Sequence, residues 1–269
     1  MHSEIFQLGP LTVRSFGLLM ALGFLAAGYA AVWLARGTHR NTDYLSTLIM
    51  WLMLAGVLGA RLAYVIEHWS AEFAGQPAAL FRIDQGGLMF YGGVAGAGAA
   101  LALFARRRRE RFLDLSDLLL AVLPLGHAFG RLGCFMHGCC HGRITHGALG
   151  VTFPRLSPAW LMHVQQGGLP ETSARSLPVL PTQLIEAGAN LALFLALATL
   201  YRRPNRRTGF VSAAYLIGYA VIRFTVESLR GDQRQSVGPL SISQAISLAA
   251  FAIGAMLLHR CSRNATRAK

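Results

Sequence analysis

The sequence predicts an all-α membrane protein with seven transmembrane helices, its N-terminus outside and its C-terminus inside, and a small extracytoplasmic cap between the fourth and fifth helices. Three observations predict this fold class: the composition, the length of the apolar segments and the distribution of the basic residues. Hydrophobic residues make up 54% of the 269 residues and charged residues 14%, whereas soluble domains contain about 25% charged residues. This composition excludes an ordinary soluble globule, and also a disordered chain, which would need low hydrophobicity and high charge.

Seven apolar segments are long enough to cross a bilayer, whose hydrocarbon core requires about 20 apolar residues per helix. Several glycines occur in the first, third and sixth segments, as is typical of closely packed membrane helices. The segments are residues 12–35, 46–67, 87–105, 113–131, 181–201, 209–229 and 241–259. The first ten residues contain no Lys or Arg, so we expect no cleaved signal peptide. We interpret residues 1–269 as one integral membrane domain.

The basic residues give the expected orientation. A net charge of +13 would suggest nucleic-acid binding in a soluble protein, but these residues flank the apolar segments, so we expect no nucleic-acid partner. The loops on one side carry 15 Lys and Arg residues and those on the other side 7. By the positive-inside rule the C-terminus then lies in the cytoplasm, and residues 132–180 form the large extracytoplasmic loop. Within it, residues 158–164 suggest a short helix, either on the membrane surface or in a folded cap.

Six ionisable residues lie within or at the ends of predicted spans, where exposure to lipid costs several kcal/mol. They are Arg61, Asp117, Arg131, Glu186, Arg223 and Glu227. Structural ion pairs are one explanation, because Arg223 and Glu227 are four residues apart and share a helix face. Convergence of several arginines on one cavity is the other, since the guanidinium group matches phosphate oxygens bidentately. The sequence therefore predicts an outward-opening cavity that binds a phospholipid head group.

Two glycine-rich segments, residues 86–98 and 126–142, border this predicted cavity. Glycines let the backbone approach a ligand or another helix closely. The second segment contains Gly130-Arg131-Leu132-Gly133 at the mouth of a span. Further motifs are Gly59-Ala60-Arg61-Leu62-Ala63-Tyr64, Leu80-Phe81-Arg82, Tyr91-Gly92-Gly93, Pro181-Thr182-Gln183-Leu184-Ile185-Glu186 and Ile217-Gly218-Tyr219 followed by Arg223. In order and spacing, these motifs resemble the prolipoprotein diacylglyceryl transferase family over nearly the whole chain.

The resemblance implies a transferase that moves the diacylglyceryl group of phosphatidylglycerol to the lipobox cysteine of a prolipoprotein. A thioether forms and glycerol phosphate leaves, in the first step of lipoprotein maturation. The nucleophile is the thiolate of the substrate, so the protein need not supply a Ser or Cys. The resemblance further implies a multi-pass protein of the bacterial cytoplasmic (inner) membrane, with phosphatidylglycerol and prolipoprotein signal peptides as partners and no cofactor.

The resemblance also implies roles for individual residues. Arg131 and Arg223 would clamp the phosphate electrostatically. Tyr91 stands where the family has a His that is a favoured catalytic base, and a phenol with a pKa near 10 is a poor base but can bond a phosphate or donate a proton. His127 is a substitute candidate for the base, and Phe16 replaces a family Tyr. The substrate-binding candidates are Arg61, Tyr64, Gly92, Gly93, Asp117, Gly130, Gly133, Gln183, Glu186, Glu227 and Arg230.

A cluster of cysteines and histidines follows the fourth predicted span: Cys134, His137, Cys139, Cys140 and His141. In an oxidising compartment a disulfide between Cys134 and Cys139 or Cys140 is one interpretation, and close packing of a tight loop is another. Thiolates and imidazoles are also ligands for zinc or copper, although the spacing differs from the usual paired knuckle. A redox or catalytic thiol is the last alternative.

Three functions are compatible with these residues. The first is the lipoprotein transferase itself, and the second is an enzyme of the same fold with a different acceptor. The third is a non-enzymatic membrane protein that binds a lipid or a metal, but a decayed site has no reason to keep Arg131, Arg223 and Glu227 in lipid. A transporter is disfavoured because the chain shows no internal repeat and its polar residues gather on one side.

Overall fold

The computed structural model describes residues 4–8, 11–36, 43–73, 75, 80, 87–232, 234 and 236–266; Phe81, Arg82 and Gly86 of the sequence motifs lie outside this part. Within it, six helices are long and apolar enough to cross a membrane, so the chain is an all-α, multi-pass membrane protein. They are α1 (Ser15–Arg36), α2 (Leu45–Glu67), α4 (Phe112–His137), α6 (Thr182–Tyr201), α7 (Phe210–Leu229) and α8 (Ile242–Thr266).

The third predicted span forms the helix α3 (Phe90–Arg108), which does not belong to these six. Its sequence is rich in Gly and Ala and ends in Arg106, Arg107 and Arg108, which lowers its hydropathy. Two short antiparallel hairpins were not predicted: β1 (Glu4–Leu8) with β2 (Leu11–Arg14), and β3 (Ser236–Val237) with β4 (Leu240–Ser241). Each hairpin leads directly into a helix, α1 or α8.

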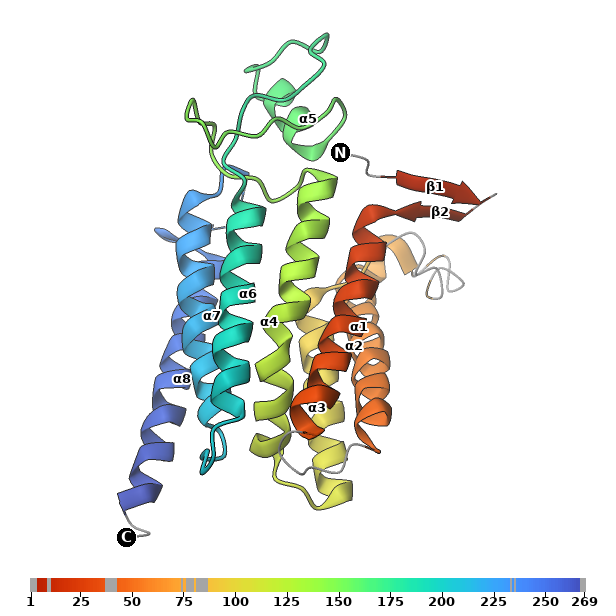
Figure 1. Cartoon of the computed structure of the whole chain (residues 1–269). Coiled ribbons are helices and arrows are strands. Elements are labelled where there is room, and N and C mark those ends of the chain that lie inside the picture. The colour runs from red at the N-terminus through yellow and green to blue at the C-terminus, as the bar shows by residue number, and fades with distance from the viewer. Residues whose placement is uncertain are drawn as a thin grey trace. The chain divides into compact units, whose positions relative to one another are not determined.

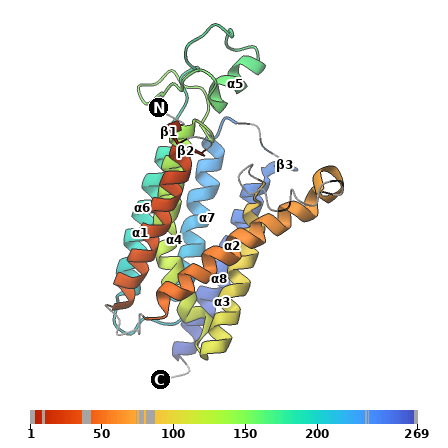
Figure 2. The ribbon, with the colours of Figure 1, turned by 90° about the vertical axis from the view of Figure 1, so that its right-hand side faces the viewer.

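The chain divides into two compact units. The larger comprises Met1–Leu34 and Asp117–Lys269, and the smaller comprises Ala35–Ser116. In the larger unit, α6 packs against α7 and α7 against α8, and α5 (Pro158–Gln165) lies beyond the ends of these helices (Figure 1). The smaller unit holds α2, the short π-helix η1 (Trp69–Phe73) and α3. In it, α2 and α3 run side by side (Figure 2).

Glycines permit close helix contacts in both units. On α4, a Cβ atom at Gly133 would lie 2.9 Å from the Phe16 ring of α1, and one at Gly130 would lie 3.3 Å from the Met20 sulfur. In the smaller unit, a Cβ atom at Gly59 of α2 would clash with the carbonyl oxygen of Gly92 on α3. Such contacts allow two backbones to approach without intervening side chains.

Residues 138–181, between α4 and α6, form a small folded cap. The predicted loop starts at residue 132, but α4 continues to His137 and ends at Gly138, whose φ of 81° is the left-handed conformation that glycine adopts readily at helix ends. Phe153, Ala159 and Val179 form the core of the cap. The helix α5 therefore packs into a cap, the second of the two alternatives for this segment, and the Ser157 hydroxyl caps its N-terminus by accepting from the Trp160 amide.

Asp117 joins α4 to the beginning of α7. Its fully buried carboxylate forms an ion pair of 2.7 Å with Arg206 and accepts hydrogen bonds from the backbone amides of Gly209 and Ser212. The Ser212 hydroxyl donates a further bond of 2.7 Å. These are the contacts of a charged helix cap, favoured by the positive end of the α7 dipole.

We expect Asp117→Asn to destabilise the protein by about 2 kcal/mol, because an amide loses the charge and one of the acceptors that bind α7. Unfolding in mixed detergent micelles, followed by circular dichroism, measures this loss. Ser212→Ala and the double variant complete a cycle, in which the two substitutions should be strongly non-additive. Additive effects would contradict the direct coupling of Asp117 to Ser212.

Candidate active site

A buried network of charges lies in the larger unit, between α4, α6 and α7. Glu186 of α6 is its centre: one oxygen lies 3.1 Å from Nε of Arg131 on α4, and the other lies 3.8 Å from Nη1 of Arg223 on α7. The Glu186 side chain is 2% exposed. Both arginines that the sequence predicts as a phosphate clamp therefore converge on one carboxylate, which places their guanidinium groups next to each other.

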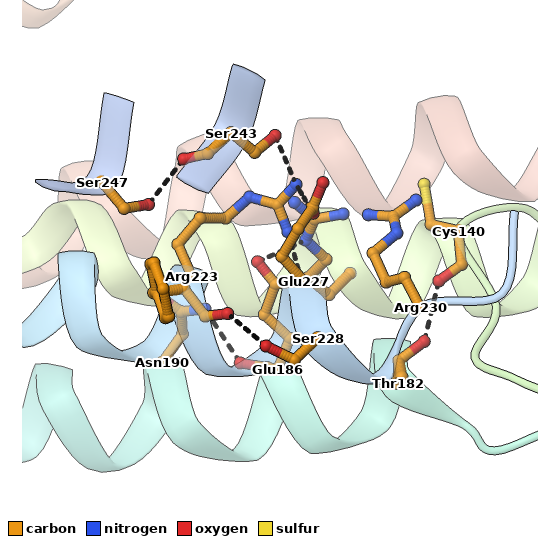
Figure 3. Close-up of polar contacts among 12 residues, drawn as sticks. Cys140, Thr182, Glu186, Asn190, Arg223, Glu227, Ser228, Arg230, Ser243 and Ser247 are labelled. Carbon is orange, nitrogen blue, oxygen red and sulfur yellow. Dashed lines mark hydrogen bonds and ion pairs between the residues drawn. The ribbon is translucent and has the colours of Figure 1, made fainter. Parts of the chain in front are cut away.

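Arg223 has two further partners. Its Nη2 atom lies 2.7 Å from Glu227, one turn later on α7, and donates a hydrogen bond of 3.0 Å to the Ser243 hydroxyl of α8. The Ser247 hydroxyl in turn donates to the Ser243 carbonyl oxygen (Figure 3). The guanidinium of Arg223 is thus held between α7 and α8, while its Nη1 atom is buried without a hydrogen-bond partner among the described residues.

The charges of this network do not cancel. Glu227 also pairs with Arg234 at 3.6 Å, and Arg230 forms a bidentate pair with Asp232, which Arg234 approaches at 3.2 Å. The cations are Arg131, Arg223, Arg230 and Arg234, and the carboxylates are Glu186, Glu227 and Asp232. Among the residues that the structure describes, the network therefore has one cation in excess, which suits the single negative charge of a phosphodiester.

Aromatic side chains form one wall of the network and were missed as site residues. Tyr219 lies one turn before Arg223 on α7, stacks on Tyr215 and has its ring centroid 4.9 Å from that of His127. The Tyr219 hydroxyl interacts with Arg131. The spacing of four residues between Tyr219 and Arg223 could have indicated this, because residues four apart lie on the same face of a helix. Nδ1 of His127 is buried and has no hydrogen-bond partner within the described part of the chain.

The turn after α4 is fixed against the beginning of α6. Thr182 donates a hydrogen bond of 2.9 Å to the Cys140 carbonyl, and the Gln183 side chain donates one of 2.7 Å to the Cys139 carbonyl. Cys140 adopts φ of 62°, a left-handed conformation that is uncommon outside glycine. The predicted site residue Gln183 therefore positions a backbone turn. Among the described residues, no hydrogen bond joins its side chain to Arg131 or Arg223.

Three thiols gather at this turn. Cys134, Cys139 and Cys140 are free cysteines, and their sulfur atoms all lie within 4.8 Å of one another. The pKa of the Cys140 thiol lies below its ordinary value, because the other two thiols donate hydrogen bonds to it and the Arg230 and Arg131 guanidinium groups lie nearby. Figure 3 shows the Arg230 guanidinium beside the Cys140 sulfur. The pKa of the Cys139 thiol is raised by its hydrogen bonds to Cys134 and Cys140.

The histidines of the predicted cluster lie apart from these thiols. His137 is exposed at the end of α4. His141 is buried, bonds the Gly142 carbonyl through Nδ1 and packs its ring against His163 of α5, with the centroids 5.7 Å apart. Burial, together with the charge of His141, lowers the pKa of His163. The metal-ligand group found among the described residues therefore contains three cysteines and no histidine.

The smaller unit holds the remaining candidates. Arg61 of α2 donates to the carbonyl oxygens of Leu80 and Gly87, each at 3.1 Å, and its guanidinium lies 5.7 Å from the centre of the Tyr64 ring. Tyr64 donates to Glu72 at 2.9 Å. Tyr91 lies on α3 and is 53% exposed within the structure.

The structure thus brings together one part of the predicted set. Arg131, Glu186, Arg223 and Glu227 form the network, and Arg230 extends it toward Cys140. Asp117 lies 14 residues before Arg131 on α4, about 21 Å along the helix axis, and its contacts are those of a helix cap. Gly130 and Gly133 face α1, and Gly92 and Gly93 face α2. Arg61, Tyr64 and Tyr91 belong to the smaller unit.

Comparison with known proteins relates this chain to a family. The family model for prolipoprotein diacylglyceryl transferase matches residues 3–260. The phosphatidylglycerol–prolipoprotein diacylglyceryl transferase 2 of Clostridium perfringens is 34% identical over 264 residues, covering 97% of this chain and 94% of the relative. The transferases of Legionella pneumophila strain Lens (34% identity; 94% of each chain) and Pseudoalteromonas atlantica (35%; 87% of this chain and 77% of the relative) are also similar. The chain belongs to the prolipoprotein diacylglyceryl transferase family.

Proposed function

We propose that the protein transfers the diacylglyceryl group of phosphatidylglycerol to the cysteine thiol of a prolipoprotein. In this reaction the substrate sulfur forms a bond to the glyceryl carbon that carries the phosphate. The bond between that carbon and the phosphate oxygen breaks, and glycerol phosphate leaves with the electron pair of that bond and takes up the proton equivalent that the thiol gives up. The relatives bear this activity in their names, and the arginine network of the larger unit suits the leaving phosphate.

The observation that carries the proposal is the convergence of Arg131 and Arg223 on opposite oxygens of Glu186. Two guanidinium groups held in this way are preorganised for the charge that develops on the departing phosphate. Their fixed position requires little reorganisation during the reaction, and the buried surroundings strengthen the attraction. The excess positive charge of the network favours an anionic lipid over a neutral one.

We infer the membrane placement from the basic residues. All seven predicted segments then cross the cytoplasmic membrane of a bacterium as one domain, with α3 as the third span. Arg106, Arg107 and Arg108 at the end of α3 lie in the cytoplasm, and the cap lies outside. The beginning of α6, the end of α7 and Arg131 near the end of α4 would then face the extracytoplasmic side, where signal peptides emerge.

We further propose that Tyr91, Arg61 and Tyr64 bind substrate. Tyr91→Phe is expected to lower the rate of transfer about 10- to 150-fold, because a hydrogen bond to a charged group contributes roughly 1.5–3 kcal/mol. The rate is measured with purified enzyme, phosphatidylglycerol vesicles and a lipobox peptide. Tyr29→Phe is the matched control, because the Tyr29 ring is 77% exposed on α1. An unchanged rate for Tyr91→Phe would contradict a role of the Tyr91 hydroxyl in the reaction.

The overall activity is tested by complementation of a bacterium depleted of its own transferase. We expect the wild-type chain to restore growth and the thioether-linked lipid on lipoproteins, measured by mass spectrometry. Failure of a well-expressed, membrane-inserted wild-type chain would contradict the proposed acceptor. Transfer of the diacylglyceryl group to another thiol or alcohol would then identify an enzyme of the same fold with a different acceptor.

A further inference from the structure

We propose that Cys134, Cys139 and Cys140 bind a soft, thiophilic metal ion, cuprous copper, through three thiolate ligands. This site goes beyond the transferase reaction, in which the thiols have no assigned part. It occupies the turn between the end of α4 and the beginning of α6. Its residues are separate in the sequence from the glutamates that pair with the arginines.

The geometry of the three sulfurs fits a three-coordinate ion. All three sulfur atoms lie within 4.8 Å of one another, and none is part of a disulfide. A planar three-coordinate site with metal–sulfur bonds of about 2.3 Å requires sulfurs about 4 Å apart. Small rotations of the cysteine side chains therefore suffice to close the site.

The backbone holds these thiols in position before any ion binds. The amides of Gly138 and Cys139 donate to the Cys134 carbonyl at 2.9 and 3.2 Å, which folds the turn back onto the helix. Thr182 and Gln183 bind the carbonyls of Cys140 and Cys139. The left-handed φ of Cys140 is unfavourable for a residue other than glycine and persists only where surrounding contacts enforce it. A metal site gains affinity when its ligands are positioned in this way.

The surrounding charges favour thiolates. A cuprous ion with three thiolates carries two negative charges, and the guanidinium groups of Arg131 and Arg230 both interact with Cys140. Arg131 also lies one turn before Cys134 on α4 and interacts with it. Two cations beside the sulfurs therefore offset the charge that the ligands must carry.

The number and type of ligands favour copper over zinc. Structural zinc is almost always four-coordinate, and among the described residues the group that could hold an ion has three members. His141 is directed to the Gly142 carbonyl and His163 instead. Thiolate-only ligands select soft ions such as Cu(I). A site of three thiolates without a fourth ligand is therefore best suited to Cu(I).

A titration of the full-length protein tests this site. The reduced protein in detergent micelles is titrated with Cu(I) under anaerobic conditions against a chromophoric chelator, and X-ray absorption counts the sulfur neighbours. We expect one ion per chain with three sulfur neighbours. Ser substitution of Cys134, Cys139 or Cys140 should each weaken binding by about tenfold or more.

Cys261→Ser is the matched control, because Cys261 lies near the other end of the bundle, where its thiol bonds the Thr208 carbonyl. This variant should bind Cu(I) as the wild type does. Equal loss in the Cys261 variant, fewer than three sulfur neighbours, tighter binding of Zn(II), or a disulfide that reforms in preference to the metal site would each overturn the proposal. These readouts do not depend on transferase activity, so they remain decisive if the proposed function fails.

Discussion

Replacement of Arg131 with alanine is expected to lower the kcat/KM of diacylglyceryl transfer by about 100- to 1000-fold, the effect typical of losing one donor that stabilises developing charge. Arg131 is one of two guanidinium groups on Glu186, and its side chain is 21% exposed, more than the 11% of Arg223. It is therefore the member of the pair more accessible to an incoming phosphate. The rate is measured with phosphatidylglycerol vesicles and a lipobox peptide, and the same variant should fail to complement.

Two companion variants separate the role of the charge from that of its shape. Arg131→Lys keeps the charge but loses the planar fork, so its rate should fall between those of wild type and Arg131→Ala. Arg143→Ala removes an exposed arginine of the cap and should leave the rate unchanged. A fully active Arg131→Ala enzyme would contradict the phosphate clamp.

Replacement of Glu186 with alanine is expected to destabilise the protein by about 3–5 kcal/mol, the usual cost of removing one partner from a buried ion pair. The effect is large because Glu186 is the shared partner of Arg131 and Arg223: Arg131 would lose its carboxylate at 3.1 Å, and Arg223 would keep its pair with Glu227 but lose the second carboxylate. Unfolding in mixed detergent micelles, followed by circular dichroism, measures the loss. Activity should fall as well, because the two guanidinium groups would repel each other.

An exposed glutamate of the cap provides the control for this measurement. Glu171→Gln should change the free energy of unfolding by less than about 0.5 kcal/mol. The double variant Glu186→Leu with Arg131→Met should recover part of the stability lost in Glu186→Ala, because it removes a stranded charge along with its partner. If Glu186→Ala unfolded like the wild type, Glu186 would not be the centre of the network.

The six long apolar helices and the arginine network were predictable because both follow from strong local rules. Apolar length predicts the helices, and an ionisable residue in a span must find a partner, so Arg131, Glu186, Arg223 and Glu227 were expected to meet. Arg223 and Glu227 lie one turn apart as their spacing predicts. Asp117 also has partners, but they differ from those expected. Its carboxylate caps α7, because the backbone amides at the start of a helix are hydrogen-bond donors for a buried charge.

Features that depend on contacts between distant segments were not predictable. The pairing of Gln183 with the Cys139 carbonyl joins residues 44 positions apart, and no periodicity signals it. Cys134, Cys139 and Cys140 cluster without His137 or His141 because the chain makes a left-handed turn at Cys140. A glycine at this position would have indicated such a turn in the sequence, but a cysteine does not. The two hairpins before α1 and α8 are too short to produce an alternating pattern.

The hydrogen bonds at the base of the cap determine where it can be exchanged between relatives. The amide of Gly142 donates to Leu180, that of Leu180 to Arg143, and that of Arg143 to Leu229 at the end of α7. The strip around residues 142–143 and 180 is therefore part of the helical bundle as much as of the cap. A chimera that carries a foreign cap should join it near residues 146 and 177, so that the host keeps this strip and the arginine network beneath it intact.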